Sequence, residues 1–184
     1  MADSRRADAQ RNRSRILDIA RSAFATDPDV SLNTIAKSAG VGPGTLYRHF
    51  PTREALLLAV YQQEIELLGT SVGQLLTIEA PLEAFRRWAR KLAELVRIKH
   101  GLGEALASPA AQAVIDATYE PVTSAIGELL DAAEAAGDIR AGVDAADVLL
   151  LLSALWRVPP GDAGLVQADR ILDMVVDSLA SPPR

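Results

Sequence analysis

Residues 31–50 have the sequence SLNTIAKSAGVGPGTLYRHF, and this stretch decides the expected fold of the first third of the chain. Its first half repeats apolar residues at helical spacing, at Leu32, Ile35, Ala36 and Ala39. Ser31 precedes them, where a hydroxyl can accept a hydrogen bond from a first-turn amide. Gly40 follows them, where a chain leaving a helix often needs the positive φ that costs glycine little. The stretch therefore predicts a helix that ends in a tight glycine turn.

A second short helix is expected after the turn. Pro43 suits its first turn, because proline has no amide hydrogen to leave unpaired there. Leu46 and Phe50 give this helix an apolar side, and the other side carries Thr45, Tyr47, Arg48 and His49. Two helices joined in this way are typical of the helix-turn-helix of DNA-binding proteins, whose second helix presents hydrogen-bonding side chains to base edges. An ordinary helical hairpin explains the apolar positions equally well, but it does not explain the polar face.

The longer run at 35–57, IAKSAGVGPGTLYRHFPTREALL, resembles the signature of TetR-family transcriptional regulators. The matching features are Ile35-Ala36, Ala39-Gly40-Val41, Gly44-Thr45-Leu46-Tyr47, His49-Phe50, and Arg53-Glu54 followed by Leu56. Two positions depart from the family pattern. Gly42 stands where the family often has a serine, which removes a hydroxyl contact to phosphate. The loop Asp27-Pro28-Asp29 lacks the usual glycine and aromatic residue, so it is expected to differ in shape.

The resemblance implies an all-α protein of about nine helices. It implies a helix-turn-helix DNA-binding domain over residues 1–52 and a helical regulatory and dimerisation domain over residues 53–184. The implied function is regulation of transcription, usually repression, by a homodimer that binds a palindromic double-stranded DNA operator and is released by a small apolar effector. The expected DNA-binding residues are Arg15, Ser31, Asn33, Pro43, Gly44, Thr45, Tyr47, Arg48, His49 and Arg53.

Composition agrees with a helical protein and excludes several kinds of site. Ala and Leu are abundant and aromatic residues are few, which favours helices. The chain has no cysteine, which excludes disulfides and thiolate chemistry, and no metal site or cofactor is expected. The N-terminus lacks the apolar core of a secretory signal, and the apolar run Val148–Trp156 is too short to cross a bilayer. A cytoplasmic protein is expected.

Charge is distributed unevenly along the chain. Residues 1–60 hold nine Lys or Arg against six Asp or Glu, a net charge of +3. Residues 61–184 hold ten against eighteen, a net charge of −8. The whole-chain net charge of −5 therefore hides a basic end suited to phosphate and an acidic remainder.

Several basic residues near the N-terminus admit two interpretations. Residues 1–12 are either a solvated tail or an arm that follows phosphate or enters a minor groove, and the two roles are compatible. A helix is expected over 12–25, where Arg15 contacts phosphate or is simply solvated. Thr52 is expected to cap a further helix. Arg53 lies in the first turn of that helix and matches the basic residue with which the family contacts phosphate. It either has that role here or pairs with a nearby glutamate.

The remaining helices are expected over 53–69, 80–98, 102–107, 110–136, 145–157 and 166–179, with a weak zone over 69–77. Pro121 should kink or divide the long segment at 110–136. The short element at 102–107 corresponds by resemblance to the helix that connects effector pocket and DNA-binding head. The helix at 145–157 contains LLLLSALW, which is apolar nearly all round, so the last two helices are the expected dimer interface.

A small-molecule site in the second domain is expected from the residues Phe85, Trp88, Leu92, His100, Tyr119 and Trp156. The five apolar or aromatic residues either surround a cavity or simply fill a core. His100 either lies at the pocket wall or caps a helix C-terminus. The basic cluster Arg86, Arg87, Arg90 and Lys91 is interpreted as a solvated helix face.

Three other classes of function compete with this interpretation. An architectural DNA-binding dimer without a ligand would have a filled second domain and weak sequence preference. A helical dimerisation module that binds protein is compatible with the acidic second domain, but the polar face at Thr45–His49 argues against it. An enzyme is not expected, because two isolated histidines and no phosphate-binding loop or metal-ligand spacing provide no catalytic constellation.

Overall fold

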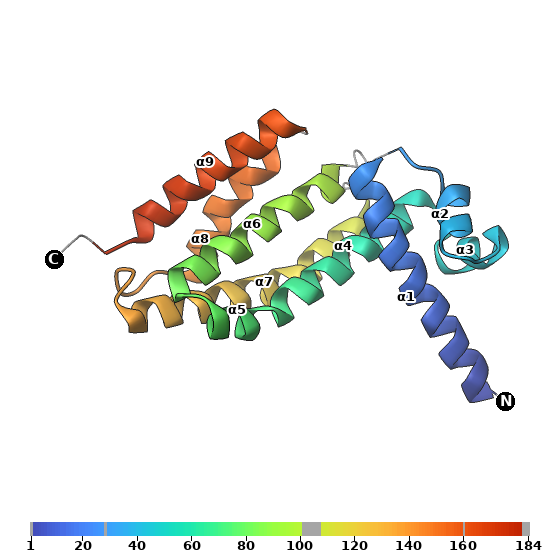
Figure 1. Cartoon of the computed structure of the whole chain (residues 1–184), viewed down its shortest axis with the longest axis horizontal. Helices are drawn as coiled ribbons and strands as arrows, with labels where there is room; N and C mark the ends of the chain where they lie inside the picture. The colour runs from blue at the N-terminus through green and yellow to red at the C-terminus, as the bar shows by residue number, and fades with distance from the viewer. Residues whose placement is uncertain (1, 28, 101–107, 160, 182–184) are drawn as a thin grey trace. The chain divides into compact units, whose positions relative to one another are not determined.

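The computed structural model describes residues 2–27, 29–100, 108–159 and 161–181, with side chains for all of these except residues 2–6, 96–100, 110 and 156. The described chain is helical, as Figure 1 shows. Its helices are α1 (Ala2–Thr26), α2 (Leu32–Ser38), α3 (Pro43–His49), α4 (Arg53–Thr70), α5 (Val72–Ile78), α6 (Pro81–His100), α7 (Pro109–Ala136), α8 (Ala145–Leu152), the 3₁₀ turn η2 (Ser153–Arg157) and α9 (Asp162–Leu179). The described residues contain no β-strand beyond an isolated bridge between Ile139 and Ala180, so the all-α prediction is confirmed.

The chain divides into two compact units. The first unit comprises residues 1–63 and 98–111, and the second comprises residues 64–97 and 112–184. The expected helix at 102–107 lies outside the described residues. The functional boundary at residues 52/53 stays a prediction, and it falls within the first unit because α4 begins there and its first half belongs to that unit.

Helix α1 begins about ten residues earlier than the apolar pattern predicts. Its first turns lack an apolar stripe, but they are rich in alanine and arginine, which favour helix, and Arg11 forms an ion pair with Asp8 one turn away. The apolar stripe starts at Ile16 and continues through Ala20 and Phe24, all of them buried. Helices α1, α2 and α3 pack against one another around this stripe.

The turn between α2 and α3 has the geometry that its sequence predicts. The Ser31 hydroxyl accepts a hydrogen bond from the Thr34 amide at 3.1 Å and so caps α2. Gly40 adopts a φ of +64°, and the following amide, of Val41, donates to the Ala36 carbonyl at 3.0 Å. Pro43 is the first residue of α3. These local interactions confirm the helix-turn-helix.

The second unit has its core around α6. Phe85 and Trp88 are fully buried, together with Ile126 and Leu129 of α7. The Trp88 indole donates from Nε1 to the carbonyl of Leu68, at 3.0 Å. A buried indole needs such a partner, because an unpaired N–H away from water is costly. Trp88 therefore fixes α6 against the last turn of α4.

The zone at 69–77 is more ordered than its glycines predict. Helix α5 covers most of it, and Val72 and Leu75 are buried. Gly73 lies inside α5 on the exposed side of that helix. Burial of two apolar side chains therefore outweighs the lower helix propensity of one glycine.

Helix α7 continues through Pro121 without division. Pro121 is exposed, and the carbonyl that its missing amide would have bonded belongs to Ala117, which is exposed as well. The expected helix at 145–157 changes to the 3₁₀ turn η2 after Leu152. Helix α9 starts at Asp162, after Gly161 with a φ of +95°. No helix in the described part of the chain has an apolar stretch long enough to cross a membrane.

Candidate functional site

Helix α3 has a buried face and an accessible face. Leu46 is fully buried and Phe50 is 2% exposed, so the apolar side packs into the first unit. On the other side Tyr47 is 44% exposed and Arg48 is exposed, while Thr45 and His49 are half-buried. Burial of Thr45, Tyr47 and Arg48 would have contradicted the predicted recognition face, and the structure instead leaves them available to a partner.

The start of α3 is open. Gly42 precedes the helix without a side-chain cap, and Pro43 and Gly44 follow, all three exposed. A Cβ added at Gly42 or Gly44 would meet no atom within 4 Å. The two glycines therefore leave the start of α3 open to close approach by a partner.

Predicted DNA-binding residues at the start of α2 and on α1 are also accessible. Ser31 is exposed, and its hydroxyl also shares a hydrogen bond with the Thr34 hydroxyl at 2.9 Å. Asn33 is exposed in the first turn of α2. On α1, Arg15 is exposed and donates to the side-chain oxygen of Asn12 at 3.0 Å. All of these residues belong to the first unit.

Arg53 has a different environment from the other predicted contacts. It is half-buried, its Nη1 donates to the carbonyl of Val30, and its guanidinium carbon lies 4.9 Å from the centroid of the Phe24 ring. Thr52 caps α4, accepting from the Ala55 amide at 3.1 Å. Hydrogen bonds from its own backbone N–H and from the Thr52 hydroxyl lower the pKa of the Glu54 carboxyl. Neither sequence interpretation of Arg53 anticipated its contacts with Val30 and Phe24.

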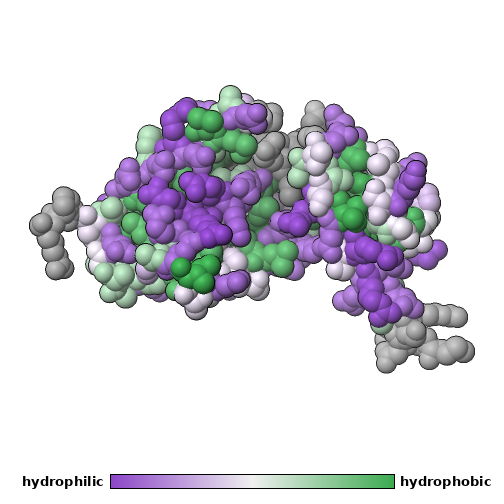
Figure 2. Space-filling model, viewed as in Figure 1, coloured by the Kyte–Doolittle hydropathy of each residue, from purple (hydrophilic) through white to green (hydrophobic). Residues whose placement is uncertain are grey.

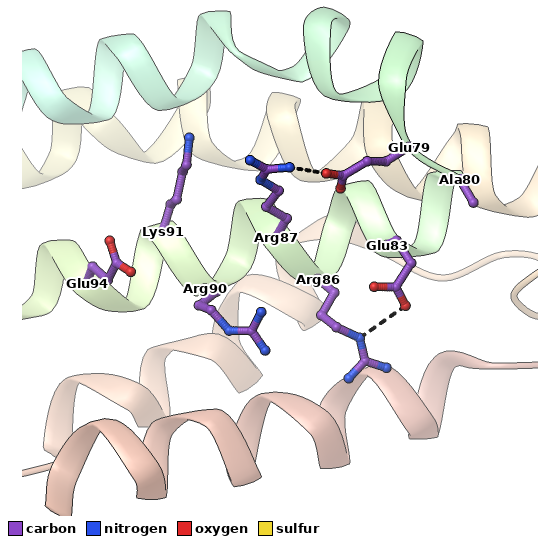
Figure 3. A pocket seen from close by; sticks show the side chains of 8 residues that line it. All are labelled: Glu79, Ala80, Glu83, Arg86, Arg87, Arg90, Lys91 and Glu94. Carbon is purple, nitrogen blue, oxygen red and sulfur yellow. Dashed lines mark hydrogen bonds and ion pairs between the residues drawn. The ribbon is translucent and has the colours of Figure 1, made fainter. Parts of the chain in front are cut away.

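A charged groove of about 630 Å³ runs along α6 in the second unit. Figure 3 shows its lining side chains, which are Glu79, Ala80, Glu83, Arg86, Arg87, Arg90, Lys91 and Glu94. Figure 2, viewed as in Figure 1, shows hydrophilic surface over this region. The predicted effector residues do not line this groove.

The three arginines of the basic cluster of α6 form ion pairs, so they are not simply solvated. Arg86 forms ion pairs with Glu83 at 3.4 Å and with Asp173 of α9, and Arg87 pairs with Glu79. Arg90 Nε donates to Asp169 of α9 at 2.9 Å, and this carboxylate raises the pKa of Arg90. The sequence contained a signal for the pairs between α6 and α9. Arg86 and Arg90 are four positions apart, as are Asp169 and Asp173, and four positions is about one helical turn.

The predicted effector residues fall into three groups. Phe85 and Trp88 are fully buried and Leu92 is 5% exposed, so these three lie together on the inner face of α6. Tyr119 on α7 is 56% exposed and is not part of that core in the single chain. The side chains of His100 and Trp156 lie outside the described residues. The aromatic core of α6 is consistent with either a pocket wall or a filled interior.

Large apolar side chains are exposed on the last two helices. Leu150 is 71% exposed and Leu151 50% exposed on α8, and Val166 is 56% and Met174 66% exposed on α9. Helices α8 and α9 also contact each other, so these exposed apolar side chains belong to neighbouring helices of the second unit. Among the residues that the structure describes, no three His, Asp or Glu side chains lie close enough to hold a metal ion.

Both units are similar to known protein families. Residues 16–60 match the bacterial regulatory proteins of the tetR family, and residues 80–181 match the C-terminal domain of SbtR-like transcriptional regulators. An HTH-type transcriptional regulator of Staphylococcus aureus strain USA300 is 40% identical over 72 residues, which are 38% of this chain and 39% of that protein. The chain thus spans less than half the length of the curated relatives it matches.

Solved structures extend the similarity to nearly the whole chain. A TetR transcriptional regulator from Streptomyces coelicolor is 38% identical, over 93% of this chain and 99% of that one, with a TM-score of 0.77. A TetR transcription regulatory protein from Mycobacterium vanbaalenii is 34% identical, over 96% of this chain and 99% of that one, with a TM-score of 0.64.

Proposed function

The chain belongs to the TetR family of transcriptional regulators, and on that basis we propose that it binds a palindromic DNA operator as a homodimer. The family consists of DNA-binding regulators, so the chain is not an enzyme. The observation that carries the proposal is the two-sided α3, with Leu46 fully buried and Tyr47 and Arg48 exposed. One such helix contacts few base pairs, and two copies related by a two-fold axis double the contacts.

The exposure of the side chains indicates which residues contact bases and which contact phosphates. Thr45, Tyr47 and Arg48 contact base edges in the major groove, and His49 lies at the edge of that face. Pro43 and Gly44 allow close approach of the backbone. Ser31, Asn33 and Arg15 hold phosphates on either side and set the register. Residues 1–52 form the DNA-binding domain in this scheme, and residues 53–184 form the regulatory and dimerisation domain.

A binding experiment tests the recognition face. A duplex is first selected from a randomised library by the unsubstituted chain, and its affinity is then measured for Tyr47→Ala with Arg48→Ala. A good bidentate pairing with a base is worth about 1–3 kcal/mol, so specific binding should fall by at least roughly fivefold while the oligomeric state persists. Unchanged specific binding in the double variant would show that another surface contacts the bases.

The dimer interface is proposed to form from α8 and α9. Support comes from the exposed Leu150 and Met174, since a monomer rarely leaves several large apolar side chains exposed on neighbouring helices. Sedimentation should give a dimer for the unsubstituted chain and a monomer for Leu150→Lys with Met174→Lys. Leu67→Lys is a matched control, because Leu67 on α4 is 54% exposed but lies outside the proposed interface. Dissociation by the control alone would refute the assignment.

The regulatory step is proposed to be repression relieved by a small apolar effector. An effector acts only through its different affinity for the DNA-bound and released forms, so it must bind the released form more tightly. Phe85, Trp88 and Leu92 supply the apolar surface that such a molecule requires. Thermal-shift screening with apolar compounds, followed by DNA release, tests this step.

A second candidate is an architectural DNA-binding dimer without an effector. The complete burial of Phe85 and Trp88 is compatible with it, because side chains that only fill an interior need no ligand. The two candidates differ in their preference among DNA sequences. Selection of one duplex at least about a thousandfold over a scrambled duplex supports the regulator, whereas near-equal binding supports the architectural protein.

A further inference from the structure

Two arginines of the first unit lie on aromatic rings of the same unit. The guanidinium carbon of Arg53, in the first turn of α4, is 4.9 Å from the Phe24 ring near the end of α1. The guanidinium carbon of Arg13, in α1, is 5.4 Å from the ring of Phe50, which ends α3. Both distances are within the range in which a cation is attracted to the face of an aromatic ring. The helices of this unit are thus connected by charged side chains as well as by apolar packing.

Arg53 also holds the loop that leads into the helix-turn-helix. Its Nη1 donates to the carbonyl of Val30, which immediately precedes the α2 cap, Ser31. The loop itself is closed by hydrogen bonds to Asp27. The Val30 amide donates to the Asp27 carbonyl at 3.2 Å, and the Asp29 amide donates to the Asp27 carboxylate at 2.9 Å. One side chain therefore connects the start of α4, the end of α1 and the entrance of α2.

We propose that Arg53 is a positioning residue for the recognition helix, acting through Phe24 and Val30. This inference rests on the proposed DNA-binding function, and it assigns to Arg53 a role other than the phosphate contact that its place in the motif implies. The loop entrance sets where α2 starts, and α2 packs directly against α3. Loosening the Arg53 contacts therefore lets the polar face of α3 depart from the geometry that base contacts require.

The geometry requires arginine in particular. A guanidinium is planar, so it can lie over a ring and still donate from its edge to a carbonyl. A lysine ammonium at position 53 retains the charge, but it cannot hold both the Phe24 ring and the Val30 carbonyl in this arrangement. A phosphate contact would depend on the charge, whereas the positioning role depends on the shape of the group. Arg53→Lys separates the two.

The first experiment needs no DNA. Unfolding by urea is measured for Arg53→Lys, Phe24→Leu and the double variant, with helix content checked by circular dichroism. Arg53 is half-buried, so its cation–π contact should lie between the exposed and the desolvated cases, which corresponds to roughly tenfold in the unfolding equilibrium constant. The effects of the two substitutions should therefore be strongly non-additive. Arg15→Lys combined with Phe24→Leu is the matched control and should be additive. Additive effects for Arg53 and Phe24 would overturn the inference.

The second experiment measures the salt dependence of binding to the duplex selected by the unsubstituted chain. Arg53→Lys and Phe24→Leu should each weaken binding by about tenfold and leave the slope of log K against log salt unchanged. Arg15→Gln, which removes a proposed phosphate contact, should instead reduce the slope by about 0.9 for each phosphate that the protein no longer neutralises.

The outcomes separate the inference from the function on which it rests. Unsubstituted affinity in Arg53→Lys, together with a reduced slope in Arg53→Gln, would make Arg53 a phosphate contact alone and refute the positioning role. Selection of no duplex by the unsubstituted chain would refute the proposed function. The urea experiment would still decide whether Arg53 and Phe24 act together in the fold.

Discussion

Replacing Gly164 by alanine should destabilise the second unit, although alanine is the better helix former. Gly164 lies in the first turn of α9 and is buried. A Cβ at this position would lie 1.8 Å from the carbonyl oxygen of Pro159, 2.9 Å from its carbonyl carbon and 3.2 Å from Cγ1 of Val158. The obstacle is backbone, which cannot rotate away as a flexible side chain can. The start of α9 must therefore move away from the loop before it.

The size of the effect is the difference between two opposing contributions. Helix propensity alone favours alanine over glycine by about 1 kcal/mol. Relief of the overlap requires the loop and the helix to separate by more than about an ångström, and overpacking of this kind typically costs about 1–3 kcal/mol, occasionally more. Because the overlap is with backbone, the upper part of that range applies, about 2–3 kcal/mol, and we expect a net loss of roughly 1–2 kcal/mol in the free energy of unfolding. In a chain of this size that lowers Tm by about 2–8 °C.

Gly127→Ala provides the matched control. Gly127 is in the interior of α7, and its added Cβ would be 3.9 Å from the Cβ of Ala145, an ordinary contact. This variant should be neutral or more stable by up to about 1 kcal/mol. Thermal unfolding of both variants, followed by circular dichroism at one protein concentration, gives the comparison, since Tm of a dimer depends on concentration. A Gly164→Ala chain that melts at or above the unsubstituted Tm would refute the close approach of α9 to Pro159.

Three further predictions concern single side-chain interactions. Trp88→Phe should cost about 1–3 kcal/mol, measured by urea unfolding, because it removes the buried indole donor to the Leu68 carbonyl and leaves a gap. Arg90→Gln should cost less than about 1 kcal/mol, and the loss should shrink at high salt, because Arg90 and Asp169 are each about half exposed. Glu54→Gln should lower Tm slightly at neutral pH but not in acid. The Glu54 pKa is lowered on folding, so its contribution is complete above the ordinary value of 4.5 and disappears as pH falls through the lowered pKa.

The helix-turn-helix was predictable because its boundaries are fixed by local chemistry. Ser31 caps α2 through its own hydroxyl, Gly40 has the positive φ expected of it, and Pro43 starts α3. Each of these features depends on residues within four positions. The start of α1 was not predicted because it forms a helix without an apolar stripe. Helix α5 was not predicted because its segment contains glycine. In α5, the burial of Val72 depends on neighbours that the local sequence does not reveal.

The candidate site was predictable only in part, for a related reason. Helical periodicity correctly put Tyr47 and Arg48 on the side opposite Leu46. Periodicity could not indicate that Arg53 meets Phe24, which is 29 positions earlier in the chain. The contact appears only when packing brings the end of α1 beside the start of α4. Exposure on one helix is thus a local property, whereas the partner of a charged side chain is a tertiary one.

This distinction changes how the basic charge of the first unit should be interpreted. Arg13 and Arg53 lie against aromatic rings, and Arg11 pairs with Asp8, so these cations already have partners in the free protein. A count of basic residues therefore overestimates the number of phosphates that the unit neutralises. Because the slope of log K against log salt depends on that number, the measured slope should be shallower than the composition of residues 1–60 suggests. A slope as steep as the full basic count requires would mean that these internal contacts break when the protein binds DNA.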